Sequence, residues 1–170
     1  MAKAKTPGKS VNTKPPAKKA PPKPPAKAPS AKAAPKPSAG GTKDKPWKLS
    51  TPSGGSTFEA WRDETAAPPA LVCNVGSTVL SYQLRCIEDL HAMLKKRSDW
   101  MALGGADEQK PATEGSVEAW ARSPANPVKG WYGLKKGFRG RFGHYVPPVM
   151  EFLGLAEVEH NPKNNRMRAK

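Results

Sequence analysis

The chain is poor in the residues on which metal sites and many enzymes depend. Its 170 residues include two cysteines and three histidines. Cys73 and Cys86 match no zinc-ligand spacing and are too few for a disulfide framework, so we expect two buried, reduced thiols. His91, His144 and His160 have no metal-like spacing from one another and no local set of cysteines or carboxylates beside them. We therefore predict no metal, no cofactor and no catalytic residue.

Long apolar runs are also missing. No stretch approaches the roughly 18 apolar residues that a membrane span requires. The basic N-terminal residues are not followed by the apolar core of about 7–15 residues that a secretory signal contains. The sequence therefore predicts a soluble, cytoplasmic protein without a membrane partner.

Acidic residues are nearly absent from the first part of the chain. Residues 1–50 hold 13 lysines, no arginine and one acidic residue, Asp44, and so account for +12 of the net charge of +15. Residues 51–170 carry only +3. Blocks of like charge of this kind often serve as arms that bind polyanions.

Residues 1–46 are also low in complexity. They consist almost entirely of Lys, Pro, Ala, Ser, Gly and Thr and contain 11 of the 20 prolines. Prolines at this density prevent helices and strands from forming, and there is little apolar surface to bury, so we predict a disordered, extended tail. The composition resembles the tails of linker histone H1 and the H1-like tails of bacterial nucleoid proteins. Residues 47–56 are predicted to be a linker.

From residue 57 the composition is that of a globular domain, and the pattern predicts a small α+β domain over residues 57–170. The expected elements are an N-terminal strand at 57–63, a β-hairpin over 69–84, a helix over 85–103 and a helical turn or strand at 116–120. The hairpin signal is two β-rich runs on either side of Gly76-Ser77. The helix has apolar residues at spacings of three and four, and Gly104-Gly105 is expected to end it.

The stretch GWYGLKKGFRGRFGHYVPP at 130–148 is rich in aromatic residues, glycine and basic residues. On a helix over 131–145, five apolar side chains would share an arc of about 80°: Trp131, Leu134, Phe138, Phe142 and Tyr145. The same helix would place three glycines on the opposite side and basic residues at the edges: Gly133, Gly137, Gly140, Lys135, Lys136, Arg139 and Arg141. We interpret the glycine-lined face as a surface against which a nucleic-acid backbone or a protein lies. The alternative is that the glycines permit tight internal packing and that the charges only solvate the domain.

The last part of the chain predicts a short helix and a hairpin. The prolines at 147 and 148 are expected to break the preceding helix and to begin a new one, which ends at Gly154. A turn at 161–164 would give four cross-strand pairs: His160–Asn165, Glu159–Arg166, Val158–Met167 and Glu157–Arg168. Residues 147–170 resemble the passage from recognition helix to wing in winged-helix domains, which implies a winged-helix-like C-terminus. The domain as a whole resembles small uncharacterised bacterial domain proteins.

These features predict a non-enzymatic nucleic-acid-binding protein, with DNA favoured over RNA, associated with the nucleoid. The tail lysines would neutralise phosphates and release counterions, and the folded domain would position the complex. The residues assigned to nucleic-acid contacts are Lys18, Lys19, Lys23, Lys27, Lys32, Lys36, Lys135, Lys136, Arg139, Arg141 and Lys163. Deleting residues 1–46 is expected to weaken binding to duplex DNA and to flatten its salt dependence.

A second hypothesis is a structural or protein-interaction module. In this hypothesis the glycine-lined face binds a protein, and the basic tail only adheres to RNA, the ribosome or an acidic partner. An enzyme is the third hypothesis, and no constellation supports it, because the stretch at 130–148 contains neither GxGxxG nor GxxxxGK[ST]. A titration of residues 57–170 against duplex DNA separates the first two hypotheses.

Overall fold

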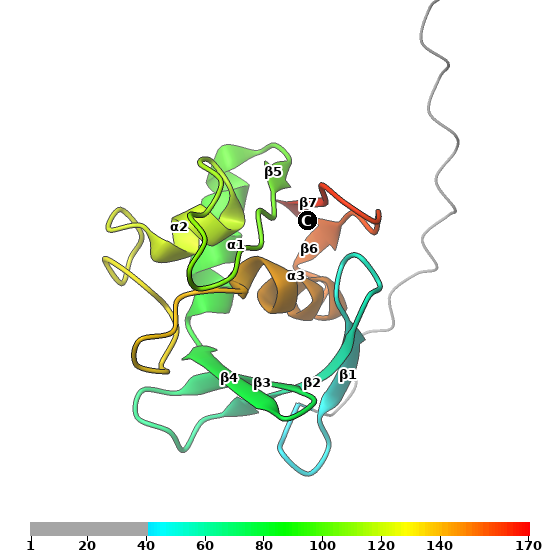
Figure 1. Cartoon of the computed structure of the whole chain (residues 1–170), viewed down its shortest axis with the longest axis vertical. Helices are drawn as coiled ribbons and strands as arrows, with labels where there is room; N and C mark the ends of the chain where they lie inside the picture. Colours follow the sequence, from blue (N-terminus) through cyan, green and yellow to red (C-terminus); the bar gives the residue numbers. More distant parts are fainter. Residues whose placement is uncertain (1–40) are drawn as a thin grey trace, which may run out of the picture. The chain divides into compact units, whose positions relative to one another are not determined.

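The structure is a computed structural model that describes residues 41–170 (Figure 1). Predictions made for residues 1–40 lie outside the described residues. They include the disordered tail and the nucleic-acid contacts assigned to it, Lys18, Lys19, Lys23, Lys27, Lys32 and Lys36.

The described residues form an α+β domain, as predicted, with two antiparallel sheets and three helices. The first sheet has the strand order β1-β2-β3-β4 and consists of β1 (Trp47–Ser50), β2 (Thr57–Asp63), β3 (Ala70–Val75) and β4 (Thr78–Gln83). The helices are α1 (Cys86–Arg97), α2 (Val117–Arg122) and α3 (Phe142–Phe152). The second sheet has the order β5-β7-β6 and consists of β5 (Met101–Ala102), β6 (Ala156–Val158) and β7 (Arg166–Ala169).

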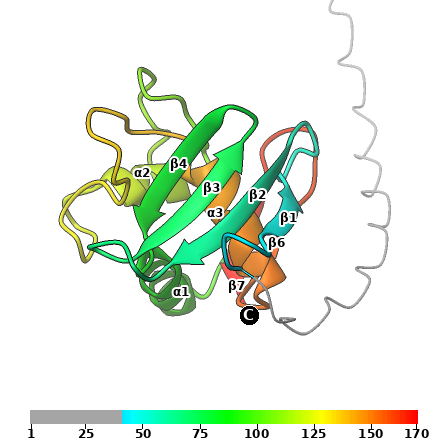
Figure 2. The same ribbon diagram turned by 90° about the horizontal axis from the view of Figure 1, so that it is seen from below.

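The first sheet forms because alternate residues of its strands are apolar. The buried side chains on its inner face are Phe58, Ala60, Leu71, Cys73, Leu80 and Tyr82. The helices lie on this side of the sheet (Figures 1 and 2). The strand predicted at 57–63 and the hairpin predicted over 69–84 are confirmed, and Val75 pairs with Thr78 across the two-residue turn.

Residues 47–50 are a strand, whereas a linker was predicted over 47–56. β1 pairs with β2 so that Trp47 lies opposite Ala60. Trp47 is buried, and its ring centroid lies 5.7 Å from that of Phe152 in α3. The prediction was wrong because two apolar residues in a short polar stretch carry too little periodicity to indicate an edge strand, which depends on its partner strand for its hydrogen bonds.

Helix α1 ends well before the predicted end at residue 103. Ser98 adopts a left-handed conformation with a φ of 57°, and its N–H donates to the Leu94 carbonyl at 3.0 Å, which closes the helix. Met101 belongs to β5, where it pairs with Met167. Its spacing matched the helix because both elements bury apolar residues in the same core.

Residues 131–141 do not form the predicted helix. Helix α3 begins at Phe142, and the residues before it run beside β4, where Gly133 forms a bridge with Tyr82. Gly137 has a φ of 79°, which lies outside the right-handed helical region. The helical glycine-lined face is therefore not formed. Apolar spacing that fits a helix does not produce one where glycines lower the helix propensity and another segment offers backbone pairing.

Four of the five apolar residues predicted to turn inward do so, and Leu134 is not among the residues packed against the core. Phe142 and Tyr145 are buried, and Trp131 and Phe138 are partly buried against the core. Tyr132, which lies outside the predicted stripe, is fully buried. The aromatic side chains thus enter the core from an irregular segment and from α3.

Helix α3 continues through Pro147 and Pro148, where a break was predicted. A proline inside a helix removes a backbone hydrogen bond and costs about 3 kcal/mol or more. Burial offsets this cost, because none of the α3 residues is exposed and each buried large apolar side chain contributes about 1.5–3 kcal/mol. The rings of Tyr145 and Phe58, for example, meet edge to face at 5.0 Å.

The C-terminal hairpin has the predicted register. Val158 lies opposite Met167 and Glu157 lies opposite Arg168. Strand β5 pairs with the other edge of β7. Helix α3 and this hairpin follow one another in the helix-then-wing order that the winged-helix resemblance implies. The first sheet covers α3, however, so α3 has no exposed face to place in a DNA groove as a recognition helix does.

Candidate functional site

Most of the basic residues that were predicted to contact phosphate in the folded domain lie in one loop, residues 134–141, which we call the basic loop. Lys135, Lys136 and Arg139 are exposed. Within the described residues these three side chains form no ion pair. The basic loop therefore presents three positively charged side chains that take part in no ion pair within the described residues.

Hydrogen bonds fix both ends of the basic loop. At its start, the Leu134 N–H donates to the Ser81 carbonyl of β4 at 2.8 Å. At its end, the Arg141 N–H donates to the Ala106 carbonyl at 2.9 Å. The Arg141 guanidinium also lies 2.7 Å from the carboxylate of Asp107, so this fourth predicted contact is ion-paired. The loop is thus held between β4 and the residues that follow β5.

Gly140 allows the end of the basic loop to approach the neighbouring main chain closely. A Cβ at this position would lie 2.8 Å from the Ala106 carbonyl oxygen and 2.8 Å from the Glu108 nitrogen. The Gly140 carbonyl also accepts a hydrogen bond from the buried Tyr82 hydroxyl at 3.3 Å. A larger residue would displace the loop from the segment that it contacts.

The last predicted contact, Lys163, is exposed in the turn of the C-terminal hairpin. We call residues 159–165 the wing loop. The Asn165 side chain accepts a hydrogen bond from the Asn161 N–H at 2.6 Å and donates one to the Asn161 carbonyl at 2.8 Å. These two bonds close the loop and hold Lys163 at its tip.

The arginines of β7 are ion-paired. The shortest Arg166–Glu159 and Arg168–Glu157 distances are both 2.6 Å, which confirms the acid–base pairs predicted for the hairpin. Both guanidinium groups lie over the Trp100 ring, at 5.5 Å and 4.8 Å from its centroid. The hydrogen bond from Arg166 also lowers the pKa of Glu159. These arginines therefore add little net positive charge to the hairpin.

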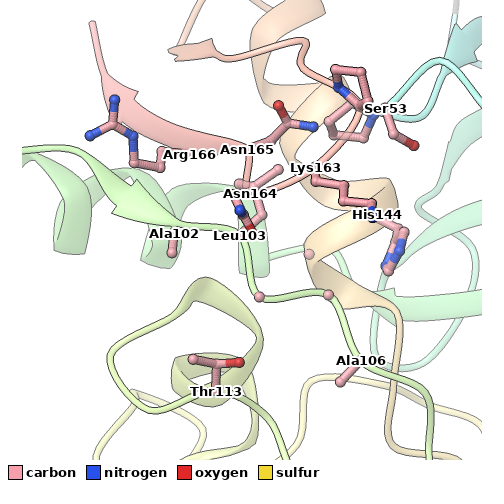
Figure 3. A pocket seen from close by; sticks show the side chains of 15 residues that line it. Ser53, Ala102, Leu103, Ala106, Thr113, His144, Lys163, Asn164, Asn165 and Arg166 are labelled. Carbon is pink, nitrogen blue, oxygen red and sulfur yellow. The ribbon is translucent and has the colours of Figure 1, made fainter. Parts of the chain in front are cut away.

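A groove of about 640 Å³ lies between the wing loop, residues 102–106 and the start of α3 (Figure 3). The turn after β1 contributes residues 52–53 to its wall. We call it the glycine-lined groove, because Gly104, Gly105 and Gly143 form part of its surface. No aspartate or glutamate lines it.

Of the side chains that line the glycine-lined groove, those of Lys163, Arg166 and His144 carry basic nitrogen atoms (Figure 3). The His144 Nδ1 atom is buried and has no hydrogen-bond partner within the described residues. The ring lies against Gly105, where a Cβ would collide with it. Burial, and then the charge of Arg141, lower the pKa of His144, so the imidazole is neutral at neutral pH.

A buried ion pair joins the parts of the chain that enclose the groove. Glu118 in α2 is fully buried, and its carboxylate lies 2.7 Å from the Arg122 guanidinium and accepts the Gly143 N–H at 2.8 Å. Arg122 also donates to the Ala106 carbonyl at 3.0 Å. Burial raises the pKa of Glu118, and the bonds from Gly143 and Arg122 oppose this shift. This pair was not predicted from the sequence, although its four-residue spacing on a helix is a visible signal.

Residues 102–106 connect two of the predicted nucleic-acid contacts, Arg141 and Lys163, although this segment was not predicted to take part in binding. Residues 102–106 contact the end of the basic loop at Arg141 and also line the groove beside Lys163. From the sequence, residues 102–105 were predicted to form the end of a helix. The paired glycines at 104 and 105 were a usable signal, because such residues often mark a close approach of the main chain.

Three further features that the sequence raised concern the cysteines, metal ligands and membrane spans of the described residues. Cys73 and Cys86 are buried free thiols, as predicted, and burial raises the pKa of both. Among residues 41–170, no three His, Cys, Asp or Glu side chains gather as metal ligands do. No helix in the same part of the chain has the length and apolar character of a membrane span.

Together these features define a small α+β domain with a C-terminal three-stranded sheet and a groove beside it. Residues 39–170 match the model of a family of unknown function, DUF6855, and the chain belongs to this family. The predicted resemblance to uncharacterised domain proteins is thereby confirmed for these residues. Neither the curated proteins nor the solved structures contain a match.

Proposed function

We propose that the protein binds nucleic acid through the phosphate backbone and is not an enzyme. The observation that carries the proposal is the basic loop, where Lys135, Lys136 and Arg139 are exposed and form no ion pair within the described residues. The same chain carries a charge of +12 in residues 1–50. Lysines and arginines that neutralise phosphates release counterions, and this release supplies most of the affinity of nonspecific binding.

The two basic parts of the chain have different roles in this proposal. The lysines of residues 1–46 supply affinity that is independent of sequence, and the basic loop fixes how the folded domain lies on the nucleic acid. The proposal uses no recognition helix, because α3 is covered by the first sheet. DNA is the expected nucleic acid, and the nucleoid the expected setting, because the tail composition resembles that of linker histones and nucleoid proteins.

The test replaces the three exposed cations of the basic loop by glutamine. Its matched control is the triple replacement of Lys95, Lys96 and Arg97, which removes the same charge from exposed residues at the end of α1. Fluorescence anisotropy then gives the affinity of the full-length variants for a labelled DNA duplex. We expect the loop variant to bind about tenfold more weakly, which corresponds to about 1.4 kcal/mol, and the control to stay near the unmodified chain.

Melting temperatures of both variants should stay close to that of the unmodified chain, because exposed charges contribute little to stability. Equal losses of affinity in the two variants would show that binding follows net charge and not the basic loop. If the unmodified chain does not bind nucleic acid at low salt, the proposal is wrong. The protein-interaction hypothesis would then be favoured, although the helical face first assigned to it is not formed.

A further inference from the structure

The glycine-lined groove combines a lysine side chain with glycine main chain. Lys163 reaches it from the wing loop (Figure 3). Arg166 of β7 also lines it, but its guanidinium is paired with Glu159 and points away from Lys163 and His144. Glu159, the ion-pair partner of Arg166, does not line the groove. The neutral His144 ring completes this wall. An anionic group in the groove therefore meets no carboxylate.

The Gly104–Gly105 main chain forms one side of the groove, with the Ser116 side chain packed against Gly104 and the His144 ring against Gly105. Hydrogen bonds fix both of its ends, at Leu103 and at Ala106. Within residues 41–170, the N–H groups of Gly104 and Gly105 donate no hydrogen bond. Backbone N–H groups that are free to donate are common ligands of phosphate oxygens.

The shape of the domain favours one nucleic-acid strand over two. Proteins that read a duplex insert a helix or a two-stranded ribbon into its major groove. Here α3 has no exposed residue, and the arginines of the hairpin are engaged with Glu157 and Glu159. A groove of about 640 Å³ lies within the roughly 300–1,000 Å³ of sites that enclose small ligands, so its size suits a nucleotide unit of a single strand.

We infer that the glycine-lined groove binds one strand of a nucleic acid, with a phosphate between the Lys163 ammonium and the main chain of Gly104 and Gly105. The inference rests on the proposed function and names a single strand as the ligand of the groove. The following phosphates lie toward the basic loop, which meets the segment 102–106 where Arg141 bonds to it.

The test uses the full chain and compares Lys163→Gln with Lys170→Gln. Both lysines are exposed, each change removes one positive charge near the end of the chain, and Lys170 does not line the glycine-lined groove. Anisotropy at one salt concentration gives the affinities for a labelled strand of about 12 nucleotides and for the duplex of the same sequence. We expect Lys163→Gln to weaken strand binding about fivefold and duplex binding less than about twofold, and Lys170→Gln to change both by less than about twofold.

The outcomes separate this inference from the proposed function. If the unmodified chain binds but the two variants behave alike, the groove assignment is overturned and the proposed function stands. A Lys163→Gln loss as large on the duplex as on the strand overturns the single-strand preference. Displacement of the strand by millimolar inorganic phosphate at constant ionic strength would identify a free phosphate ligand instead. If the unmodified chain binds neither nucleic acid, the proposed function itself fails.

Discussion

Among single residues, Glu118 connects the parts of the molecule that enclose the glycine-lined groove. Its buried carboxylate bonds to Arg122 and to the Gly143 N–H. We expect Glu118→Ala to lower the free energy of unfolding by about 3–5 kcal/mol, because it leaves Arg122 largely buried without its partner. Glu118→Gln keeps the shape and one acceptor, so its effect should be smaller. Urea denaturation measures the free energy of unfolding of both variants. Equal decreases would show that the acceptor retained by glutamine does not contribute to stability.

His144 gives the domain a pH-dependent stability. Its pKa in the folded state is below the ordinary value of about 6.5 because the ring is buried and Arg141 lies near. Above about pH 6.5 the ring is neutral in both the folded and the unfolded state, so its titration does not change the free energy of unfolding. As the pH falls below about 6.5, the unfolded chain takes up a proton first, so the free energy of unfolding decreases until the folded-state pKa is passed.

Urea denaturation at a series of pH values tests this expectation. His144→Asn, which does not titrate, should show a smaller decrease in the free energy of unfolding as the pH falls through this range. Other groups titrate near the lower end of the range, so the comparison is between the two chains at each pH. A decrease of the same size in both chains would mean that His144 is not its source.

Among the elements, the basic loop and α3 differ in how deeply their aromatic residues are buried. A helix over 131–145 would have made Phe138 and Phe142 equivalent core residues. In the structure Phe138 is only partly buried, whereas Phe142 is fully buried. The rings around Phe142 are those of Tyr82, Trp120, Trp131 and Tyr132, at centroid distances of 5.4, 6.4, 6.2 and 5.9 Å.

We therefore expect Phe142→Ala to lower the free energy of unfolding by about 3–5 kcal/mol and Phe138→Ala to lower it by less than about half as much. The two decreases differ because Phe142→Ala leaves a cavity in the core, whereas Phe138→Ala removes a side chain that is only partly buried. Chemical denaturation of both variants provides the comparison. Equal decreases would contradict the loop and favour the helix that the sequence pattern suggested.

The elements that could be predicted from the sequence are those whose signals are local. Both hairpins, β3–β4 and β6–β7, were predicted with their turns because alternation and turn residues lie within a few positions of each other. Strand β1 could not be predicted, because it depends on pairing with β2. The path of α3 through Pro147 and Pro148 depends on burial by the first sheet, which no local pattern contains.

The candidate site could be predicted only in part for the same reason. The basic residues of the basic loop and Lys163 were visible as charges in an aromatic, glycine-rich or turn context. The groove requires residues 102–106 and the wing loop to meet, and these segments are more than 50 residues apart in the sequence. Long-range packing brings them together, so sequence spacing gave no indication of it.

For the whole molecule, the boundary between tail and domain lies earlier than the sequence suggested. The Gly41 carbonyl accepts the Arg62 N–H at 2.8 Å, and the match to the family begins at residue 39. Deleting residues 1–38 removes ten lysines and keeps this hydrogen bond, whereas deleting residues 1–46 would also damage the domain. We expect the shorter deletion to weaken nucleic-acid binding and to reduce the salt slope by about 0.9 for each phosphate that the tail no longer neutralises. An unchanged slope, measured by anisotropy, would contradict the role assigned to the tail.

The central claim is that this chain binds nucleic acid through phosphate, and the salt dependence of its binding constant tests this most directly. The measurement follows the full chain with labelled duplexes and single strands of unrelated sequence over about 50–200 mM salt. We expect saturable binding, with a binding constant whose logarithm falls linearly with the logarithm of salt concentration. The slope should correspond to several neutralised phosphates and should be nearly the same for each sequence. Absence of saturable binding at about 50 mM salt, or a binding constant that does not change over this range, would contradict it.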